Sequence, residues 1–134
     1  MQLDECIELP ADEKRAREAM ELSLRWAERS KRAFERMGKP GQALFGIVQG
    51  GTDLALRRRS AEELAAMDLP GYAVGGLAVG EGHDVMLSTL EGTLPFLPDV
   101  KPRYLMGVGS PADLIEAGRR CPRKFDCGPP TRNG

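Results

Sequence analysis

Short apolar segments alternate with longer amphipathic segments along the whole chain, and this alternation constrains the fold more than any single motif. Apolar residues recur near helical spacing over residues 12–37, whereas residues 43–48 are almost continuously apolar, as in strands buried on both faces. The same criteria predict helices over 52–67, 84–94 and 111–120, and strands at 2–4, 72–74, 104–106 and ending at 126. Strands that alternate with helices are usually joined by crossovers and run parallel. The sequence therefore predicts an α/β protein built on a parallel sheet.

Turn and capping residues mark where these helices begin and end. Glycines and a proline in residues 38–41 end the first helix. Thr52 is the expected N-cap of the second helix, and Leu54, Leu56, Leu64 and Met67 are expected to face the sheet. The sequence Ser110-Pro111-Ala112-Asp113 gives the clearest signal, with a capping hydroxyl, a proline at the first helical position and an acid in the first turn.

The number of strand–helix units limits the architecture. Four units and part of a fifth fit into the 134 residues. A closed (β/α)8 barrel has eight units and takes about 250 residues. The chain is therefore either a small open α/β sheet or part of a larger barrel. Residues 2–4 have the pattern of a strand end whose beginning lies outside the sequence, which favours the partial barrel.

The composition excludes several classes of protein. With 41% hydrophobic and 29% charged residues, the chain has the balance of a soluble globular domain rather than of a disordered one. No apolar run approaches the roughly 18 residues of a membrane span, and no signal-peptide pattern opens the sequence. The three cysteines, none in C-x-x-C spacing, argue against a disulfide framework or a zinc site. We therefore expect a cytoplasmic protein with no membrane partner and no metal within this chain.

The net charge of −1 conceals a basic C-terminal segment. Residues 101–134 carry seven basic and three acidic side chains, against twelve and seventeen in residues 1–100. Such a segment could follow the phosphates of a nucleic acid. It could equally be a solvated helix end, where the helix dipole favours basic side chains. Charge alone leaves both interpretations open.

Residues suited to a ligand site follow every predicted strand. Because the ends of parallel strands meet at one edge of a sheet, these segments should converge there, where α/β proteins build their ligand sites. The segments are Asp4-Glu5-Cys6, Gln49-Gly50-Gly51, residues 75–81, Gly107-Val108-Gly109 and Asp126.

Each of these candidates has a functional and a structural interpretation. Asp126 could be a nucleophile, or a turn residue before Gly-Pro-Pro. The amide of Gln49 and the carboxylate of Asp4 could together recognise the edge of a heterocyclic base, although Gln49 could instead cap its own loop. The glycines before Ser110 would suit a phosphate at a helix start, or simply a tight turn. His83, the only histidine, is expected to make a local cap or a solvent contact without a catalytic role.

Five separated motifs together resemble the tRNA-guanine transglycosylase family. The resemblance covers essentially the whole chain, in order and at family-like spacing. The motifs are Leu3-Asp4-Glu5-Cys6, Phe45-Gly46-Ile47-Val48-Gln49-Gly50-Gly51, residues 72–81 (Tyr-Ala-Val-Gly-Gly-Leu-Ala-Val-Gly-Glu), Tyr104-Leu105-Met106-Gly107-Val108-Gly109 and Phe125-Asp126-Cys127.

The resemblance implies a transferase that exchanges guanine at the wobble position of certain tRNAs for a 7-deazaguanine on the route to queuosine. It makes Asp126 the nucleophile, which attacks the ribose C1′ and forms a covalent intermediate. It makes Asp4 the ligand of the N1/N2 edge of the base, with Gln49 and the Gly76 N–H at O6. The Leu77 carbonyl would meet the 7-substituent, and Met106 would pack against the face of the base.

The resemblance also implies the partners and the wider architecture. Residues 1–134 would be the C-terminal half of a (β/α)8 barrel, and the full-length enzyme would bind zinc outside this chain and could form a homodimer. Val79 between Ala78 and Gly80 is similar to the bacterial form, which uses preQ1 as the incoming base. Contacts to the tRNA anticodon loop would come from Gly107, Val108, Gly109, Ser110, Pro111, Ala112, Asp113, Thr131 and Arg132.

Three departures from the family pattern limit what the chain can be expected to do alone. The second catalytic aspartate of the family and its Cys/His zinc ligands are not in this sequence. Cys121-Pro122-Arg123-Lys124 replaces an apolar run, and Gly128-Pro129-Pro130 replaces the usual loop start. We therefore expect the isolated chain to be weak or inactive. The alternatives are a non-catalytic relative that binds tRNA or a partner subunit and, more remotely, an unrelated phosphate-binding α/β protein.

Overall fold

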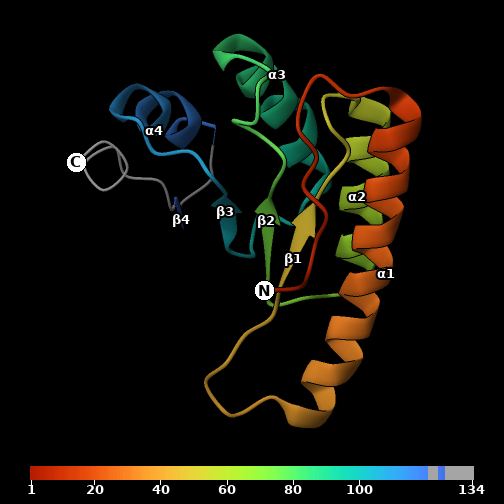
Figure 1. Cartoon of the computed structure of the whole chain (residues 1–134). Coiled ribbons are helices and arrows are strands. Elements are labelled where there is room, and N and C mark those ends of the chain that lie inside the picture. The colour runs from red at the N-terminus through yellow and green to blue at the C-terminus, as the bar shows by residue number, and fades with distance from the viewer. Residues whose placement is uncertain (121–123, 126–134) are drawn as a thin grey trace, which may run out of the picture.

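A four-stranded parallel sheet organises the molecule (Figure 1). The computed structural model describes residues 1–120 and the strand Lys124–Phe125. The strands are β1 (Phe45–Val48), β2 (Gly71–Val74), β3 (Arg103–Leu105) and β4 (Lys124–Phe125). They lie in the order β1-β2-β3-β4, and each runs parallel to its neighbour. The predicted α/β fold with a parallel sheet is therefore confirmed.

Helices connect the strands and pack against one another in chain order. They are α1 (Glu13–Met37), α2 (Leu54–Ala66), α3 (His83–Thr93) with the 3₁₀ turn η1 (Leu94–Phe96), and α4 (Pro111–Gly118). In Figure 1, α1 and α2 lie side by side next to β1. Contacts join α1 to α2, α2 to α3 and α3 to α4. Among the helices of the described residues, none is both long enough and apolar enough to cross a bilayer.

The apolar stripes that predicted the helices form one core with the strands. Met20 and Leu24 of α1 are buried, as are Leu56 and Leu64 of α2. They belong to the same cluster as the strand residues Val48, Tyr72, Val74 and Leu105. Every residue of β2 is buried, as expected for a central strand covered on both faces.

Two expectations about the start of α2 are wrong. Asp53, not Thr52, is the N-cap, because its Oδ1 accepts hydrogen bonds from the backbone N–H groups of Ala55 and Leu56 at 2.9 and 3.0 Å. A carboxylate at this position also stabilises the positive end of the helix dipole. The following residue, Leu54, is 50% exposed. Its side chain lies over Gly92 of α3 rather than facing the sheet.

Residues 2–4 do not form the predicted strand, although they lie beside β1. The Gln2 N–H donates to the Phe45 carbonyl at 3.0 Å, as in a parallel ladder. The next ladder position is taken by the Gln2 side chain, whose Oε1 accepts from the Ile47 N–H at 2.9 Å in place of a backbone carbonyl. Its Nε2 donates to the Ser23 carbonyl of α1 at 2.8 Å. A buried amide side chain thus substitutes for strand pairing at this edge of β1.

The start of α4 has the predicted cap. Ser110 Oγ accepts from the Asp113 N–H at 3.2 Å, and Pro111 is the first helical residue. The helix ends at Gly118, two residues earlier than predicted. The helix α3 begins at His83 and continues into η1, which contains Pro95. Proline at an early position of a helical turn has no N–H that needs an acceptor, so it does not stop the chain from turning there.

Candidate functional site

The carboxyl ends of β1, β2 and β3 meet at one edge of the sheet. Gln49, Gly75 and Met106 are the first residues after these three strands. The ladder continues one residue past the strands, because the Gly75 N–H donates to the Val48 carbonyl at 3.0 Å and the Met106 N–H to the Val74 carbonyl at 3.1 Å. The N-terminal segment brings Asp4 to the same place. Residues separated by about a hundred positions in the sequence therefore share one site.

A partly buried hydrogen bond between Gln49 and Asp4 forms the centre of this site. Gln49 Nε2 donates to Asp4 Oδ2 at 2.7 Å, and the Gln49 side chain is 2% exposed. The Gln49 backbone N–H donates to Ser60 Oγ of α2 at 3.2 Å. The alternative that Gln49 caps its own loop is not what the structure has, since its amide reaches a side chain 45 positions away.

The backbone of Gly75 and Gly76 lies directly against the Gln49 amide. Gly76 has a φ of +64°, in the left-handed region that favours glycine. A Cβ atom on Gly76 would lie 2.3 Å from Gln49 Oε1, and one on Gly75 would lie 2.9 Å from Gln49 Nε2. Only glycine at these positions lets the peptide approach the amide so closely. The next residue, Leu77, is 2% exposed.

A carboxylate closes the loop that follows. Glu81 accepts from the Val79 N–H at 2.9 Å and from the Ala78 N–H. Ala78 has a φ of +58°, which is unfavourable for a residue with a side chain. The two hydrogen bonds to Glu81 hold this conformation. The sequence places Glu81 in the loop of residues 75–81 but does not by itself indicate this role.

The segment after β3 is more open. Met106 is half-buried and Gly107 is exposed with a φ of +75°, whereas Val108 and Gly109 are buried. Pro111 and Ala112 are exposed at the start of α4. Of the described residues for which tRNA contacts are predicted, these two present their side chains most fully to solvent.

His83 is exposed to solvent, in line with one of its two expected contacts, but its hydrogen bond is not a local cap. Its Nδ1 lies 2.8 Å from Asp113 Oδ1, so the start of α3 is joined to the start of α4 across 30 positions. Asp113 Oδ2 accepts from Ser110 Oγ at 2.6 Å. A carboxylate thus already lies at the start of α4, where it would repel a phosphate. The glycines before Ser110 lead into a self-capped helix, and a phosphate contact at this helix start stays a prediction.

A buried arginine that sequence analysis did not single out connects two of the loops. Arg57 of α2 is 0% exposed and donates to four backbone carbonyls. Nε donates to Gly51 at 2.7 Å, one terminal nitrogen donates to Gly75 at 2.7 Å and Val48 at 3.3 Å, and the other donates to Gly76 at 3.1 Å. A signal was present in the sequence, because Arg57 lies three, four and seven positions before Ser60, Ala61 and Leu64, on the buried face of α2.

The electrostatics of the site follow from this burial. Burial lowers the pKa of Arg57 to about 10, and the nearby Glu81 carboxylate opposes the shift. The guanidinium stays protonated at neutral pH. Burial raises the pKa of the Cys6 thiol, and the Asp4 carboxylate raises it further, while Arg57 and the Gly76 N–H lower it by smaller amounts. Cys6 is therefore a neutral thiol at pH 7 rather than a thiolate nucleophile.

The remaining predicted residues lie outside this description. Asp126, Thr131 and Arg132 are not among the described residues. The strand that precedes Asp126 pairs with β3 through Leu105 and Phe125, in parallel, so β4 ends at the same sheet edge as β1, β2 and β3. Within residues 1–120, no three His, Cys, Asp or Glu side chains gather as metal ligands. These residues therefore do not fit the zinc ion that the family resemblance implies.

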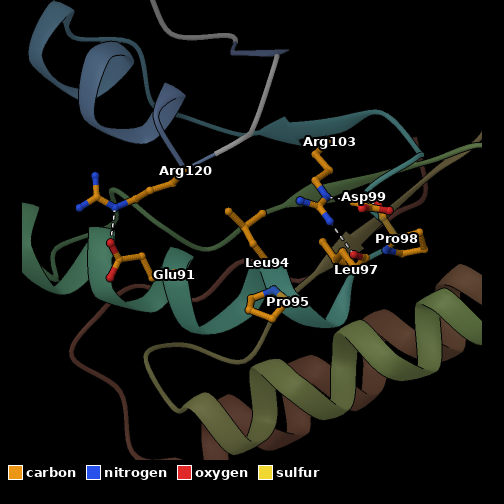
Figure 2. Close-up of a pocket in the computed structure, with 8 residues that line it drawn as sticks. All are labelled: Glu91, Leu94, Pro95, Leu97, Pro98, Asp99, Arg103 and Arg120. Carbon is orange, nitrogen blue, oxygen red and sulfur yellow. Dashed lines mark hydrogen bonds and ion pairs between the residues drawn. The ribbon is translucent and has the colours of Figure 1, made fainter.

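A pocket of about 600 Å³ lies away from this edge (Figure 2). It is near the amino end of β3, where Arg103 donates to the Leu97 carbonyl at 2.6 Å and to the Pro98 carbonyl at 3.2 Å. Figure 2 shows the Arg120 side chain directed to Glu91, with 2.5 Å between Nε and Oε1. Both guanidinium groups already have partners within the protein. The pocket is lined by Glu91, Leu94, Pro95, Leu97, Pro98, Asp99, Arg103 and Arg120.

Comparison with known proteins agrees with the motifs at the sheet edge. The family model described as queuine tRNA-ribosyltransferase matches residues 1–134. The chain belongs to the queuine tRNA-ribosyltransferase family. The resemblance to tRNA-guanine transglycosylases is thereby confirmed.

Individual relatives in this family match the whole chain. The proteins named queuine tRNA-ribosyltransferase from Agrobacterium fabrum, Brucella suis and Mesorhizobium japonicum are each 61% identical to it over 134 residues, which is 100% of this chain. The match covers 35% of the length of each relative. The chain thus spans about a third of the family proteins that it matches.

Proposed function

We propose that this chain carries the base-binding site and the nucleophile of a tRNA-guanine transglycosylase, a pentosyltransferase that acts in queuosine biosynthesis. The observation that carries the proposal is the partly buried hydrogen bond between Gln49 and Asp4, which lies against the Gly76 backbone. Membership of the queuine tRNA-ribosyltransferase family supports it.

The paired side chains are complementary to one edge of guanine. Asp4 is an acceptor and Gln49 Nε2 is a donor, and the two atoms lie 2.7 Å apart. Guanine presents N1–H and its 2-amino group as donors beside O6 as an acceptor. A bound base would therefore replace the bond between Asp4 and Gln49 with its own bonds to both, so neither polar group would lose a partner. A base without this donor and acceptor pattern would leave at least one of them unsatisfied.

The backbone and the next loop complete the proposed site. The Gly76 N–H would donate to O6 beside Gln49, and the Leu77 carbonyl would accept from the 7-substituent of the incoming preQ1. Met106, half-buried after β3, would pack on the face of the ring. These roles come from the family resemblance, and the proximity of Gln49 and Gly76 supports them.

Asp126 is proposed as the nucleophile. Its carboxylate would form a bond to the ribose C1′ at the wobble position while the bond from C1′ to guanine N9 breaks and its electron pair leaves with the base. The N9 of preQ1 would then attack C1′ and break the bond from C1′ to Asp126, which leaves as a carboxylate, and in the net reaction the N9 proton of preQ1 passes to N9 of the departed guanine. Dividing the exchange into two displacements lowers the barrier of each. In support, β4 ends at the edge that carries Asp4 and Gln49, one residue before Asp126 in the sequence.

The sheet topology supports a further proposal, that residues 1–134 are the C-terminal half of a (β/α)8 barrel. The strands follow one another in sequence order, and successive helices contact each other. A doubly wound sheet instead reverses its strand order at a switch point. Continuous winding in one direction is what closes a barrel.

The proposed partner is the anticodon loop of tRNA. Its single-stranded bases can be turned out of the stack at low cost, which the reaction requires. Contacts are proposed from residues 107–113 and from Thr131 and Arg132. A tRNA-modifying role would place the protein in the cytoplasm, and the homodimer expected for the full-length enzyme stays a prediction.

A second candidate function is a non-catalytic relative that binds tRNA or a partner subunit. The sequence around Asp126 favours it, because Pro122 and Lys124 stand in a run that is apolar in the family pattern. Such a relative would keep the base-binding residues and lose turnover.

Radiolabelled guanine exchange into unmodified tRNA, together with calorimetric guanine binding, tests the proposal. We expect Asp4→Asn to weaken guanine binding by about tenfold or more, because the acceptor for N1–H is lost. Asp126→Asn should abolish exchange and the protein–tRNA adduct on denaturing gels. Asp99→Asn, on the far side of β3, is the matched control and should change neither. Normal exchange by Asp126→Asn would refute the nucleophile, and guanine binding without any exchange would favour the non-catalytic relative.

A further inference from the structure

Arg57 is the one fully buried arginine among the described residues, and no described carboxylate lies within ion-pair distance of it. Its hydrogen bonds go to backbone carbonyls at the ends of β1 and β2. Burying a charge without a direct ion-pair partner is costly, and the more distant Glu81 carboxylate offsets this cost only in part, as the lowered pKa of Arg57 reflects. A methionine could fill a similar volume at lower cost. The placement therefore calls for an explanation beyond packing.

The orientation of one peptide group supplies the explanation. The Gly75 carbonyl and the Gly76 N–H belong to the same peptide unit, and the only cis peptide in the described chain is Leu9–Pro10. In a trans peptide the C=O and the N–H point in opposite directions. Arg57 holds the Gly75 carbonyl at 2.7 Å, so the Gly76 N–H must point away from the guanidinium. The Gly76 N–H also lowers the pKa of the Cys6 thiol.

The same guanidinium fixes the neighbouring backbone. It holds the Gly76 carbonyl at 3.1 Å and the Gly51 carbonyl at 2.7 Å, so that it joins the loop after β2 to the loop after β1. Gly75 and Gly76 would otherwise be the most flexible part of this edge, because glycine restricts the backbone least. A positive charge at the carbonyl also polarises the peptide and makes its N–H a stronger donor.

We propose that Arg57 is a positioning residue that aims and polarises the Gly76 N–H toward the 6-oxo oxygen of a bound purine. This inference rests on the proposed function and adds a positioning residue to the proposed base-binding site. Arg57 does not touch the base. It acts through the peptide between Gly75 and Gly76, and its charge favours the negative charge that develops on the oxygen of the departing base. The site thereby selects bases that carry an oxygen at this position.

The test compares two purines that differ at that position. Guanine has the oxygen, whereas 2-aminopurine lacks it, together with the proton at N1, and reports its own binding by fluorescence. The missing N1–H affects wild type and variants alike, so each variant is compared with wild type for the same purine. Arg57→Lys keeps a charge but cannot reach both loops with a planar fork, and Arg57→Met keeps only the volume. Thr93→Val is the matched control, since Thr93 is equally buried and donates within α3 to the Thr89 carbonyl at 2.7 Å, away from the site.

We expect Arg57→Lys to weaken guanine binding about tenfold and 2-aminopurine binding by less than about twofold, as for the loss of one hydrogen bond to O6. Thr93→Val should leave the ratio of the two affinities unchanged even if it lowers the melting temperature. Should Arg57→Met fail to fold, the Gly76 amide resonance in Arg57→Lys gives a second measurement, which should shift relative to wild type and to Thr93→Val.

Equal weakening of both purines, or no weakening of either, would overturn the positioning role while leaving the base site intact. An unmoved Gly76 amide resonance in Arg57→Lys would also overturn it. If the wild-type chain binds neither purine, the proposed function itself fails and this inference fails with it. The two failures are therefore distinguishable.

Discussion

The loops after β1 and β2 and the segment after β3 lie at the same sheet edge but are built differently. The first region is buried, and its glycines, Gln49 and Arg57 fix one another through short contacts. The second region is held at the surface by His83, Asp113 and Ser110. Buried polar groups specify one geometry because an unsatisfied partner is costly, whereas exposed pairs contribute little. The first region thus suits recognition of a small flat ligand, and the second suits contact with a larger partner.

Among the substitutions that test this difference between the two regions, Gly76→Ala should have the largest effect on stability and on guanine binding. An alanine would be strained at a φ of +64°, and its Cβ would collide with Gln49 Oε1. We expect a loss of about 2–4 kcal/mol in unfolding free energy, together with loss of guanine binding. Urea unfolding and calorimetry measure the two quantities. Gly118→Ala, at an open position of α4, is the control and should be neutral or stabilise by up to about 1 kcal/mol.

Ser60→Ala should have the next largest effect. The buried Gln49 N–H would lose the hydroxyl that accepts from it at 3.2 Å. We expect about 1–2 kcal/mol of destabilisation by urea unfolding. The exposed Ser88→Ala on α3 should stay within about 0.5 kcal/mol of wild type. If Ser60→Ala and Ser88→Ala lowered the unfolding free energy equally, the buried hydrogen bonds would not fix the first region more firmly than exposed ones fix the surface.

The Cys6 thiol offers a chemical probe of the same region. Its pKa is raised chiefly by burial and also by the Asp4 carboxylate. Alkylation requires the thiolate, so Cys6 should react slowly at pH 8. Asp4→Asn removes one of the causes that raise the pKa, so the Cys6 peptide should be alkylated faster at that pH, as measured by mass spectrometry. Asp99→Asn should leave the alkylation rate unchanged. A slower reaction in Asp4→Asn would show that the Asp4 carboxylate does not raise the pKa of Cys6.

The raised Cys6 pKa also has a consequence for stability. A thiol whose pKa is higher in the folded state binds more protons there than in the unfolded state. The folded state therefore gains from Cys6 below the unfolded pKa and loses this gain as the pH rises through the folded value. Cys6→Ser should remove this part of the alkaline decline in unfolding free energy.

His83→Ala should have the smallest effect. The pair of His83 and Asp113 is partly exposed, with 46% and 22% of the two side chains accessible. We expect a change of less than about 0.5 kcal/mol, most of it absent in 1 M salt. Urea unfolding at low and high salt measures it. A loss of 2 kcal/mol or more in unfolding free energy would mean that the pair of His83 and Asp113 stabilises the second region as much as the buried contacts stabilise the first.

Much of the fold could be predicted because the signals are local. The apolar stripe of α1, the Ser110 cap and the glycine-rich strand ends each act within one turn or one strand. Predictions failed where a non-local partner decided the outcome. Gln2 replaces a strand bond with its side chain because Ile47 and Ser23 lie on either side of it. His83 bonds to Asp113 because the packing of α3 against α4 brings the two helix starts together.

The sequence by itself determined the alternating parallel architecture, the family and the loops that carry the candidate residues. Periodicity, capping and turn chemistry operate over a few residues, and a motif keeps its identity whatever surrounds it. Only the tertiary structure decided that Gln49 bonds to Asp4, that Gly76 lies against that amide, and that Arg57 holds the Gly75 carbonyl. Those contacts join positions up to 45 residues apart. They form because burial forces each polar group to find a partner in space, wherever that partner lies in the chain.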